Sequence, residues 1–361
     1  MLLYHCADLH LDSKMESNLP MEKAKERQEE LVDTFAKMVT DAIKNEAKVI
    51  LIAGDLFDTS NTKFKNIKKR IVYILEQYPQ IDFLYLKGNH DDDDYFYDFD
   101  KIPENLKFFS KDKWISYTYD DVCITGRVLS DNVSDSIYDE LVLDRDKINI
   151  VTLHGQVTKA TNKKDAPLIN LKRLSNKNID YLALGHIHSY SKDNLDARGI
   201  YGYSGCLEGR GFDETGDKGF VKVEITNHEL NTKFVPIAKR NLYVVQVDIS
   251  NIESFSDILN KIKDETSGID EKNLVKVELV GEVTEDTDID VELFTSEMKK
   301  DFYFIKIEDK TQRKIDYEKY RNEISLKGEF VRVVEAENIP ENEKADIIIT
   351  GLKALAGKEL K

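Results

Sequence analysis

At 361 residues the chain exceeds the usual length of a single domain, so we expect one large domain and a smaller one. Its hydrophobic fraction of 41% is ordinary for a globular protein, and no stretch reaches the ~20 apolar residues that a membrane span requires. The net charge of −16 repels polyphosphate, so composition alone counts against a nucleic-acid ligand.

The first residues and the cysteines indicate a compartment. Met1–Cys6 has neither the basic region nor the long apolar stretch of a signal peptide, and its pattern is typical of a first strand. Cys6, Cys123 and Cys206 are odd in number and lack the spacing of metal ligands, which is usual in a reducing cytosol. We therefore expect a cytoplasmic protein that does not enter a membrane.

Short apolar runs alternate with amphipathic helices over the first part of the chain. The runs Leu2–Cys6, Val49–Ala53 and Phe83–Leu86 have the length of buried strands. Between them, apolar residues recur at helical spacing in 31–42 and 64–75. This β-α-β-α-β order predicts parallel strands whose carboxyl ends share one edge of a sheet.

The strands that follow are too many for one sheet with helices on both faces. They are expected at Val122–Thr125, Ile148–Leu153, Tyr181–Leu184, Gly199–Tyr203, Phe220–Ile225 and Lys233–Ile237. A four-layer α-β-β-α sandwich, with the late strands antiparallel, fits this order better.

After residue 240 the pattern becomes that of a small α+β domain. Ser250 and Glu253 form a capping box that predicts a helix between the strands Tyr243–Ile249 and Val275–Val280. The rest is helical and charged, and it ends in an amphipathic helix with an apolar face over 345–355. The expected domains are therefore 1–240 and 241–361.

Five short polar loops carry most of the histidines of the chain. In chain order they are Asp8-Leu9-His10, Gly54-Asp55-Leu56-Phe57-Asp58, Gly88-Asn89-His90-Asp91, Leu153-His154-Gly155 and Gly185-His186-Ile187-His188. Each lies at the end of a predicted strand, where the sites of α/β sheets are found. Carboxylates, imidazoles and an amide gathered at strand ends are suitable ligands for divalent cations.

The order and spacing of these loops resemble the calcineurin-like metallophosphoesterases, and among them the SbcD-type and YhaO-like DNA repair exonucleases. The glycine-rich stretch 203–220 resembles the same group. The resemblance implies the α-β-β-α sandwich and a small capping domain that shapes a DNA groove. It also implies two cations, one held by Asp8, His10, Asp55 and His188, the other by Asp55, Asn89, His154 and His186.

The chemistry of single residues agrees with these roles. Asp8 and His10 are two positions apart on what we expect to be an extended segment, so their side chains project to the same side. Asp55 has two oxygens and can bridge two cations. His90 follows an expected ligand but has no cation of its own to bind. We expect it to protonate the leaving oxygen, with Asp91 fixing its tautomer.

Nitrogen and oxygen donors without cysteine favour Mn²⁺, Fe²⁺ or Zn²⁺ over Ca²⁺, and the resemblance implies Mn²⁺. Two such ions about 3.5–4 Å apart activate a water and stabilise the attacking and leaving oxygens of an in-line displacement at phosphorus. The chain is therefore expected to be a metal-dependent phosphodiesterase.

The fold serves many phosphoesters, so the metals alone do not select a substrate. The resemblance implies DNA, cleaved by an exonuclease or single-strand endonuclease of repair, and an ABC- or SMC-like ATPase partner. The sequence also leaves open whether the chain forms a homodimer. Arg210 is a candidate contact to phosphate, and Asp58, where some relatives carry histidine, is a candidate substrate-binding residue. The alternatives are a phosphatase or phosphodiesterase of small molecules or nucleotides and, more remotely, a metal-free scaffold.

Charge along the chain gives two opposed indications. Basic clusters at 63–70, 163–173 and 239–240 offer contacts to phosphates, or are simply solvated faces. The acidic run 91–94 borders the predicted site and would repel duplex DNA if it faced the groove.

Overall fold

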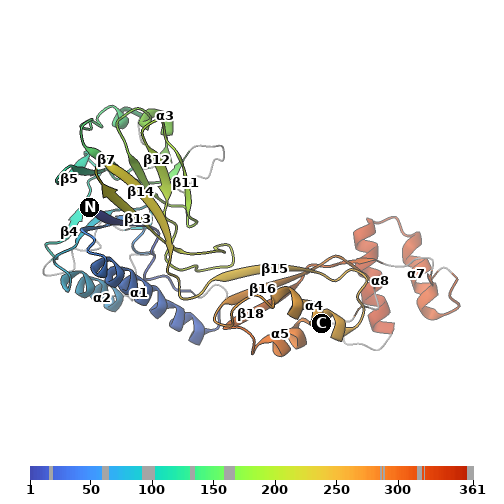
Figure 1. Cartoon of the computed structure of the whole chain (residues 1–361). Helices are drawn as coiled ribbons and strands as arrows, with labels where there is room; N and C mark the ends of the chain where they lie inside the picture. The colour runs from blue at the N-terminus through green and yellow to red at the C-terminus, as the bar shows by residue number, and fades with distance from the viewer. Residues whose placement is uncertain are drawn as a thin grey trace. The chain divides into compact units, whose positions relative to one another are not determined.

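The computed structural model describes residues 1–15, 19–58, 65–91, 102–130, 135–157, 167–284, 287, 289–314, 319–320 and 322–355 (Figure 1). The chain forms two compact units, Met1–Asn241 and Leu242–Lys361, close to the predicted division after residue 240. The role assigned to the second unit stays a prediction. In the parts of the chain that the structure describes, no helix is long and apolar enough to cross a membrane.

The first unit contains a six-stranded sheet built around the N-terminal strand. In order across the sheet, its strands are β14 (Glu229–Pro236), β13 (Gly219–Thr226), β1 (Leu2–Cys6), β2 (Val49–Ala53), β3 (Asp82–Leu86) and β4 (Leu106–Phe108). The strands β1 to β4 run parallel, which confirms the predicted β-α-β-α-β order. The hairpin of β13 and β14 adds to β1 in antiparallel orientation.

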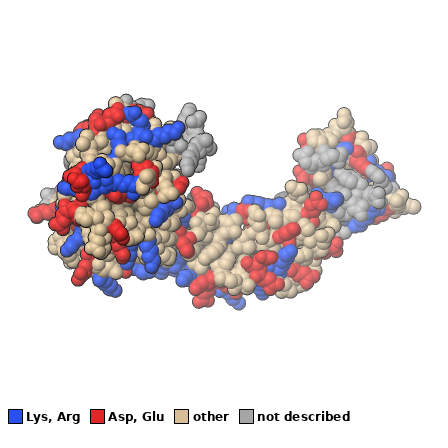
Figure 2. All heavy atoms as spheres, turned by 45° about the horizontal axis from the view of Figure 1, so that its top comes forward, with Lys and Arg blue, Asp and Glu red and all other residues tan. Residues whose placement is uncertain are grey.

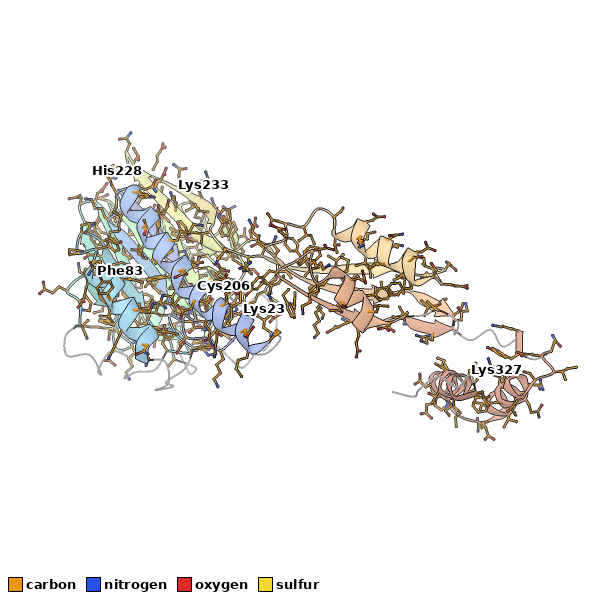
Figure 3. All side chains as sticks on the ribbon, turned by 90° about the horizontal axis from the view of Figure 1, so that it is seen from below. Lys23, Phe83, Cys206, His228, Lys233 and Lys327 are labelled. Carbon is orange, nitrogen blue, oxygen red and sulfur yellow. The ribbon has the colours of Figure 1, made fainter. Side chains whose placement is uncertain are left out.

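Two helices cover one face of this sheet, α1 (Met21–Lys44) and α2 (Lys65–Glu76) (Figure 3). Helical spacing places Phe35 and Met38 of α1 on the buried side, where they join one apolar core with Phe83 of β3. Burying each such side chain contributes about 1.5–3 kcal/mol, so this face fixes the strands on which the first three polar loops depend.

A second six-stranded sheet follows in the chain. Its order is β11 (Ser191–Asn194), β12 (Ile200–Tyr203), β10 (Tyr181–Gly185), β7 (Ile148–His154), β6 (Val122–Gly126) and β5 (Ile115–Tyr119). A short parallel pair, β8 (Gln156–Val157) and β9 (Leu168–Ile169), lies beyond β7 in sequence.

The expectation that all late strands run antiparallel is right for β13 and β14 but wrong for β12. This strand pairs parallel with β10, because the chain first passes through β11 at the edge of the sheet. The sequence did not predict β11, since its residues Ser191–Asn194 are all polar and exposed and so lack any apolar alternation.

The two sheets enclose a common core, with Leu51 and Leu84 from the first sheet and Ile150 from the second. The outer face of the second sheet packs against the 3₁₀ helix η2 (Asp135–Tyr138), the short helix α3 (Leu171–Leu174) and loops. The first unit is therefore the predicted four-layer α-β-β-α sandwich, with a thin fourth layer.

The second unit begins with the parallel sheet β15-β16-β18. Its elements are β15 (Leu242–Asp248), α4 (Phe255–Thr266), β16 (Leu274–Val280), β17 (Glu282–Thr284), α5 (Val291–Met298), β18 (Phe304–Asp309), β19 (Gln312–Lys314), α7 (Leu326–Ala336) and α8 (Glu341–Leu355). Ile258 of α4 and Phe294 of α5 share one core with Val277 of β16. The unit contains both strands and helices, but its parallel strands alternate with helices in the α/β manner, so the prediction of an α+β unit is wrong on this point.

The helix α4 begins later than the sequence predicted. Its N-cap is Ser254, whose Oγ accepts a hydrogen bond from the backbone N–H of Asp257 at 3.2 Å. The predicted cap Ser250 lies in the turn after β15, where its Oγ accepts the N–H of Glu282 at 3.1 Å. The capping box was therefore wrong, because Ser250 serves a contact distant in sequence.

The last two helices pack on each other. Val331 of α7 and Ile348 of α8 belong to a small separate core with Tyr320 and Leu352. The amphipathic face of the final helix therefore packs within its own unit.

Candidate metal centre

The five polar loops meet at the carboxyl ends of strands from both sheets. Backbone hydrogen bonds tie the first loop to the second, from Asp8 N–H to the carbonyl of Gly54 and from His10 N–H to that of Asp55, each at 3.0 Å. Across the sandwich, the backbone N–H of His186 donates to Oδ1 of Asp8 at 2.8 Å. Loops from the two sheets thus form one connected site, as sites at strand ends do.

Four of the expected ligands have a left-handed backbone. The φ angles are +53° at Asp8, +42° at His10, +53° at Asp55 and +103° at His186. The expectation that the first two lie on an extended segment is therefore wrong, and left-handed turns rather than strand alternation bring their side chains together. Strained positions of this kind cluster at functional sites, where surrounding structure holds them in place.

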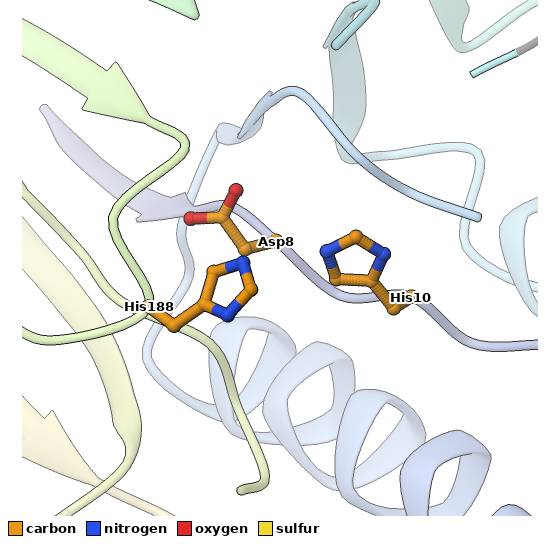
Figure 4. Close-up of side chains that lie close together, drawn as sticks. All are labelled: Asp8, His10 and His188. Atoms are coloured by element: carbon orange, nitrogen blue, oxygen red, sulfur yellow. The ribbon is translucent and has the colours of Figure 1, made fainter. Parts of the chain in front are cut away.

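One group of donors comprises Asp8, His10 and His188, whose ligand atoms lie within 4.8 Å of one another (Figure 4). The two residues from the first loop are buried, and His188 is partly exposed. Oδ2 of Asp8 and Nε2 of His10 are buried and have no hydrogen-bond partner among the residues that the structure describes. Leaving such atoms unpaired is costly, and a cation would satisfy both, so these residues fit a metal ion.

A second group shares Asp8 with the first and adds Asp55 and His154. Oδ2 of Asp55 lies 3.3 Å from Nε2 of His154 and 3.7 Å from Nε2 of His10. The Asn89 side-chain oxygen lies 3.0 Å from the same nitrogen of His154. Oδ2 of Asp55 therefore faces His10 of the first group and His154 of the second group. A ligand that bridges two cations needs this position.

Besides Asn89, His186 is the expected ligand that lies outside these two groups. Its ring lies edge-on to that of His154, with 5.6 Å between ring centroids. It therefore borders the second group, and its assignment as a ligand stays a prediction.

The electrostatics of the protein without cations reflect the crowding of these groups. Burial raises the pKa of Asp8 to about 6. Burial alone would lower the pKa of His154, but the negative charge of Asp55 outweighs burial and raises that pKa to about 9. Burial lowers the pKa of His10 to about 4, so its ring is neutral near pH 7 and has a nitrogen lone pair to donate.

The rings of His154 and His188 are each oriented from behind by a hydrogen-bond acceptor, and a carboxylate lies near the ring of His10. His154 Nδ1 lies 2.9 Å from the carbonyl of Ala53. His10 Nδ1 lies 3.2 Å from Oδ1 of Asp58, and His188 Nδ1 lies 2.6 Å from Oε1 of Glu214. Acceptors in this position fix the tautomer of a metal-binding imidazole.

Glu214 was missed by the sequence reasoning. Its side chain is buried, and it lies 26 positions from His188, within the glycine-rich stretch 203–220 that the resemblance had singled out as a whole. An acidic residue inside a run of turn-forming glycines was the only signal in the sequence that pointed to it.

The expected contact from Asp91 to His90 is corrected by the structure. The Asp91 carboxylate turns away and accepts backbone N–H groups of Phe57 at 3.1 Å and Gly88 at 2.8 Å. These bonds clamp the second loop to the third. Burial, and then the charge of Asp55, raise the pKa of Asp91 to about 6. The rest of the acidic run, 92–94, lies outside the described residues.

His90 lies at the rim of the site, with about half of its side chain exposed. Its backbone N–H donates to Oδ1 of Asp55 at 3.0 Å, and its Nδ1 lies 3.7 Å from Oδ1 of Asp58. Its neighbouring carboxylate is therefore Asp58 and not Asp91.

The two candidate substrate contacts are already engaged within the protein. Asp58 contacts His10, as above, and its Oδ1 lies 3.8 Å from Arg210. The Arg210 guanidinium also donates to Oε1 of Glu214 at 3.1 Å. Both residues therefore lie beside histidine rings of the site, and contact with substrate stays a prediction for each.

Three glycines allow the loops to approach one another closely. A Cβ added at Gly54 would lie 2.0 Å from His154 Nδ1, and one at Gly88 would lie 2.0 Å from Oδ1 of Asp55. At Gly185 it would lie 1.9 Å from the carbonyl oxygen of Ala53. Only glycine fits these positions, so they are as necessary to the site as the donors.

Known proteins match this chain over the same region. Residues 1–190 match the family model of the calcineurin-like phosphoesterases. The chain is 25% identical over 284 residues to the metallophosphoesterase YhaO of Bacillus subtilis (strain 168), covering 74% of this chain and 68% of YhaO. It is 25% identical over 300 residues to the DNA double-strand break repair protein Mre11 of Sulfolobus acidocaldarius, covering 78% of this chain and 76% of that protein. A crystal structure of a dimetal phosphatase from Danio rerio is similar with a TM-score of 0.41 and 9% identity, covering 64% of this chain and 95% of that one.

The residues that match the family model form more than half of the chain and contain all five polar loops. They also contain every donor of the two groups described above. The chain belongs to the calcineurin-like phosphoesterase family.

Proposed function

We propose that the chain is a DNA phosphodiesterase that depends on two divalent cations and acts in repair as an exonuclease or single-strand endonuclease. The observation that carries the proposal is the convergence of loops from both sheets on two adjoining groups of cation donors. Membership of the phosphoesterase family supports the chemistry. The relative Mre11 is a DNA double-strand break repair protein, which supports DNA as the substrate.

Seven residues would hold the cations. The first cation would be bound by Asp8, His10, Asp55 and His188, and the second by Asp55, Asn89, His154 and His186. Buried, unpaired donor atoms support the first set, and the Asp55 oxygen that faces both groups supports the bridging role. Nitrogen and oxygen donors without cysteine suit Mn²⁺, Fe²⁺ and Zn²⁺, and the resemblance to the SbcD-type exonucleases favours Mn²⁺.

When bound, the cations would lower the pKa of a water and polarise the phosphoryl oxygens. The remaining work belongs to the residues of the chain. His90 is exposed at the rim, and its Nδ1 lies beside Asp58, so Nε2 is the nitrogen free to give a proton to the leaving oxygen. The strained loops hold the donors in place before the substrate arrives.

The similarity to Mre11 covers 78% of this chain, which is more than the first unit alone provides. This extent supports a role for the second unit in shaping the substrate groove, as a capping domain does. On the helices α7 and α8, the side chains of Leu326, Val333 and Ile347 are exposed. Apolar side chains exposed singly are common on protein surfaces, so our placing of an ABC- or SMC-like ATPase partner, or of a second copy of the chain, at these helices rests on the family resemblance.

A small-molecule or nucleotide phosphoester is the second candidate, and charge favours it. Arg70, Arg173 and Arg240, from the three basic clusters, form ion pairs with Asp33, Asp139 and Glu26, respectively. Figure 2 shows basic side chains interspersed with acidic ones over the visible face. Paired charges of this kind contribute little to binding of a polyanion, and the net charge of −16 opposes it. The cluster residues 63 and 163–164 lie outside the described residues.

Incubating the purified chain with Mn²⁺ and end-labelled single- and double-stranded DNA distinguishes the two candidates. Cleavage that EDTA abolishes is the expected result. Intact DNA, together with rapid hydrolysis of a small aryl phosphodiester, would select the small-molecule candidate instead.

The three cysteines are free thiols, which supports the expected cytoplasmic location.

A further inference from the structure

The segment between β12 and β13 surrounds His188 with polar groups. Oε1 of Glu214 lies 2.6 Å from the ring nitrogen Nδ1. The backbone carbonyl of the same histidine accepts a hydrogen bond from Nζ of Lys218 at 2.8 Å and one from Sγ of Cys206 at 3.5 Å. All three contacting residues are buried. Both the ring and the main chain of this one histidine are therefore held by a single segment.

The distances decide which ring nitrogen of His188 carries the proton. Nδ1 has two polar neighbours, Oε1 of Glu214 at 2.6 Å and a guanidinium nitrogen of Arg210 at 3.3 Å. A carboxylate oxygen accepts and cannot donate, and a contact of 2.6 Å without a proton between the atoms would be repulsive. The shorter contact therefore sets the tautomer: Nδ1 donates to Glu214, and Nε2 is left as the nitrogen with a free lone pair.

Glu214 is itself held rigidly. Its Oε2 accepts the backbone N–H of Arg210 at 2.8 Å, and its Oε1 accepts from the Arg210 guanidinium at 3.1 Å. A buried carboxylate persists only when it is paired and hydrogen-bonded, and here one arginine supplies both contacts. The same guanidinium lies 3.8 Å from Asp58, whose Oδ1 is 3.2 Å from Nδ1 of His10.

We propose that Glu214 is a positioning residue: it fixes His188 so that Nε2 faces the cation expected at Asp8, His10 and His188, and Arg210 holds it in place. In this group the His188 imidazole is hydrogen-bonded to a carboxylate, whereas His154 of the second group is backed by a neutral carbonyl. Carboxylate partners make an imidazole the more basic ligand. The group that contains His188 therefore binds its cation more tightly and fills first.

This inference rests on the proposed pair of cation sites and is independent of the substrate. Its first test uses the metal-free wild-type protein labelled with ¹⁵N-histidine. The ring nitrogen shifts of His188, assigned by comparison with His188→Gln, report which nitrogen is protonated at pH 8. Protonation at Nδ1 is the expected result. A ring protonated at Nε2 would overturn the proposal without any Glu214 variant having to fold.

The second test is Mn²⁺ titration by calorimetry of wild type, Glu214→Gln, Glu214→Asp and a matched control, Glu229→Gln. Glu229 is an exposed glutamate at the start of β14 in the same unit. In Glu214→Gln we expect the tighter of the two binding steps to weaken by about 10–100-fold, the usual effect of losing a partner behind a ligand, and the other step to stay unchanged. Glu214→Asp keeps the charge on a shorter side chain, so its Mn²⁺ affinity at the tighter step should lie between those of Glu214→Gln and wild type. The control Glu229→Gln should bind Mn²⁺ as wild type does.

Folding is followed by the fluorescence of Trp114, the single tryptophan of the chain, which lies in the first unit. If Glu214→Gln keeps the wild-type urea midpoint and binds both cations as tightly as wild type, Glu214 has no positioning role. If the two steps weaken together, the assignment to one group is wrong. If both tests succeed and DNA remains uncut, the positioning role stands and only the proposed substrate fails.

Discussion

Replacing Gly54 by alanine tests whether His154 is seated as the structure places it. Gly54 has a φ of +99°, and a Cβ there would lie 2.0 Å from Nδ1 and 2.5 Å from Cγ of the His154 ring. Ordinary contact begins at 3.4 Å, so the ring would have to move by the difference, about 1.4 Å. The ring is buried and hydrogen-bonded to the carbonyl of Ala53, so it has no open space to enter.

The expected cost has two parts. A left-handed backbone at a non-glycine residue costs about 1–2 kcal/mol, and overpacking a filled core costs a further 1–3 kcal/mol or so. Gly216→Ala separates them, because Gly216 has a φ of +81° and nothing lies within 4 Å of an added Cβ. We expect Gly216→Ala to show the first cost alone and Gly54→Ala to show both.

The assay measures stability and cation binding on the same samples. Urea unfolding of the metal-free variants, followed through Trp114, reports on the first unit alone, since the chain has one tryptophan. Calorimetric Mn²⁺ titration then counts the sites. Displacing a ligand by more than an ångström should weaken the site of His154 at least as much as losing a partner behind it, about 10–100-fold, while the group of His188 still binds.

Equal behaviour of the two variants would refute the reasoning. If Gly54→Ala unfolds at the same urea concentration as Gly216→Ala and binds two cations with wild-type affinity, His154 does not occupy the space against Gly54. The second group of donors would then have to be rebuilt from other residues.

Three further outcomes follow from the structure. Asp55→Asn should weaken both cation sites, because one of its oxygens faces both groups of donors; two full equivalents of metal by elemental analysis would contradict the bridging role. His90→Asn should keep both cations but lose about 10²–10⁴-fold in turnover, as expected for a proton donor at the rim; loss of metal would make it a ligand instead. Burial opposes ionisation of Glu30, but hydrogen bonds from Lys239 and Arg27 outweigh it and lower its pKa. The ionised Glu30 carboxylate therefore stabilises the folded state fully above the unfolded-state pKa of about 4.3. This contribution is lost as the pH falls through the lower folded-state pKa. Glu30→Gln should flatten the fall in urea stability below that pH, and a slope equal to wild type would refute the assignment.

Much of this fold could be predicted because strand ends and polar loops coincide in the sequence. The runs Val49–Ala53 and Phe83–Leu86 are continuous and apolar, and the run before Asp8 is interrupted only by His5. All three have the length and composition of buried strands, and parallel strands bring their ends to one edge. The sequence therefore predicted the order of the loops and the sandwich that carries them. It could not predict β11, because four polar, exposed residues form a strand only when a neighbouring edge is available.

The finer contacts of the site depended on long-range geometry. Asp91 was paired with His90 because the two are adjacent in sequence, yet its carboxylate is used by backbone N–H groups of the neighbouring loop. The carboxylate beside His90 comes from Asp58, on the loop after another strand. In the same way, Glu214 reaches His188 from a different loop. Adjacency in the chain predicts which loop carries a residue, but not which way its side chain points.

The loops of the site concentrate left-handed backbone: they hold four of the twelve non-glycine residues with positive φ in the described part of the chain. Asp8, His10, Asp55 and His186 all have positive φ, and each such position costs on the order of 1–3 kcal/mol. Four of them together cost several kcal/mol, a large fraction of the roughly 5–15 kcal/mol by which a domain is stable. None of these residues packs as an apolar core side chain, so the strain serves no packing purpose. The two sheets and the bonds between the loops hold the residues in this conformation, and what the conformation provides is a set of donors facing one another.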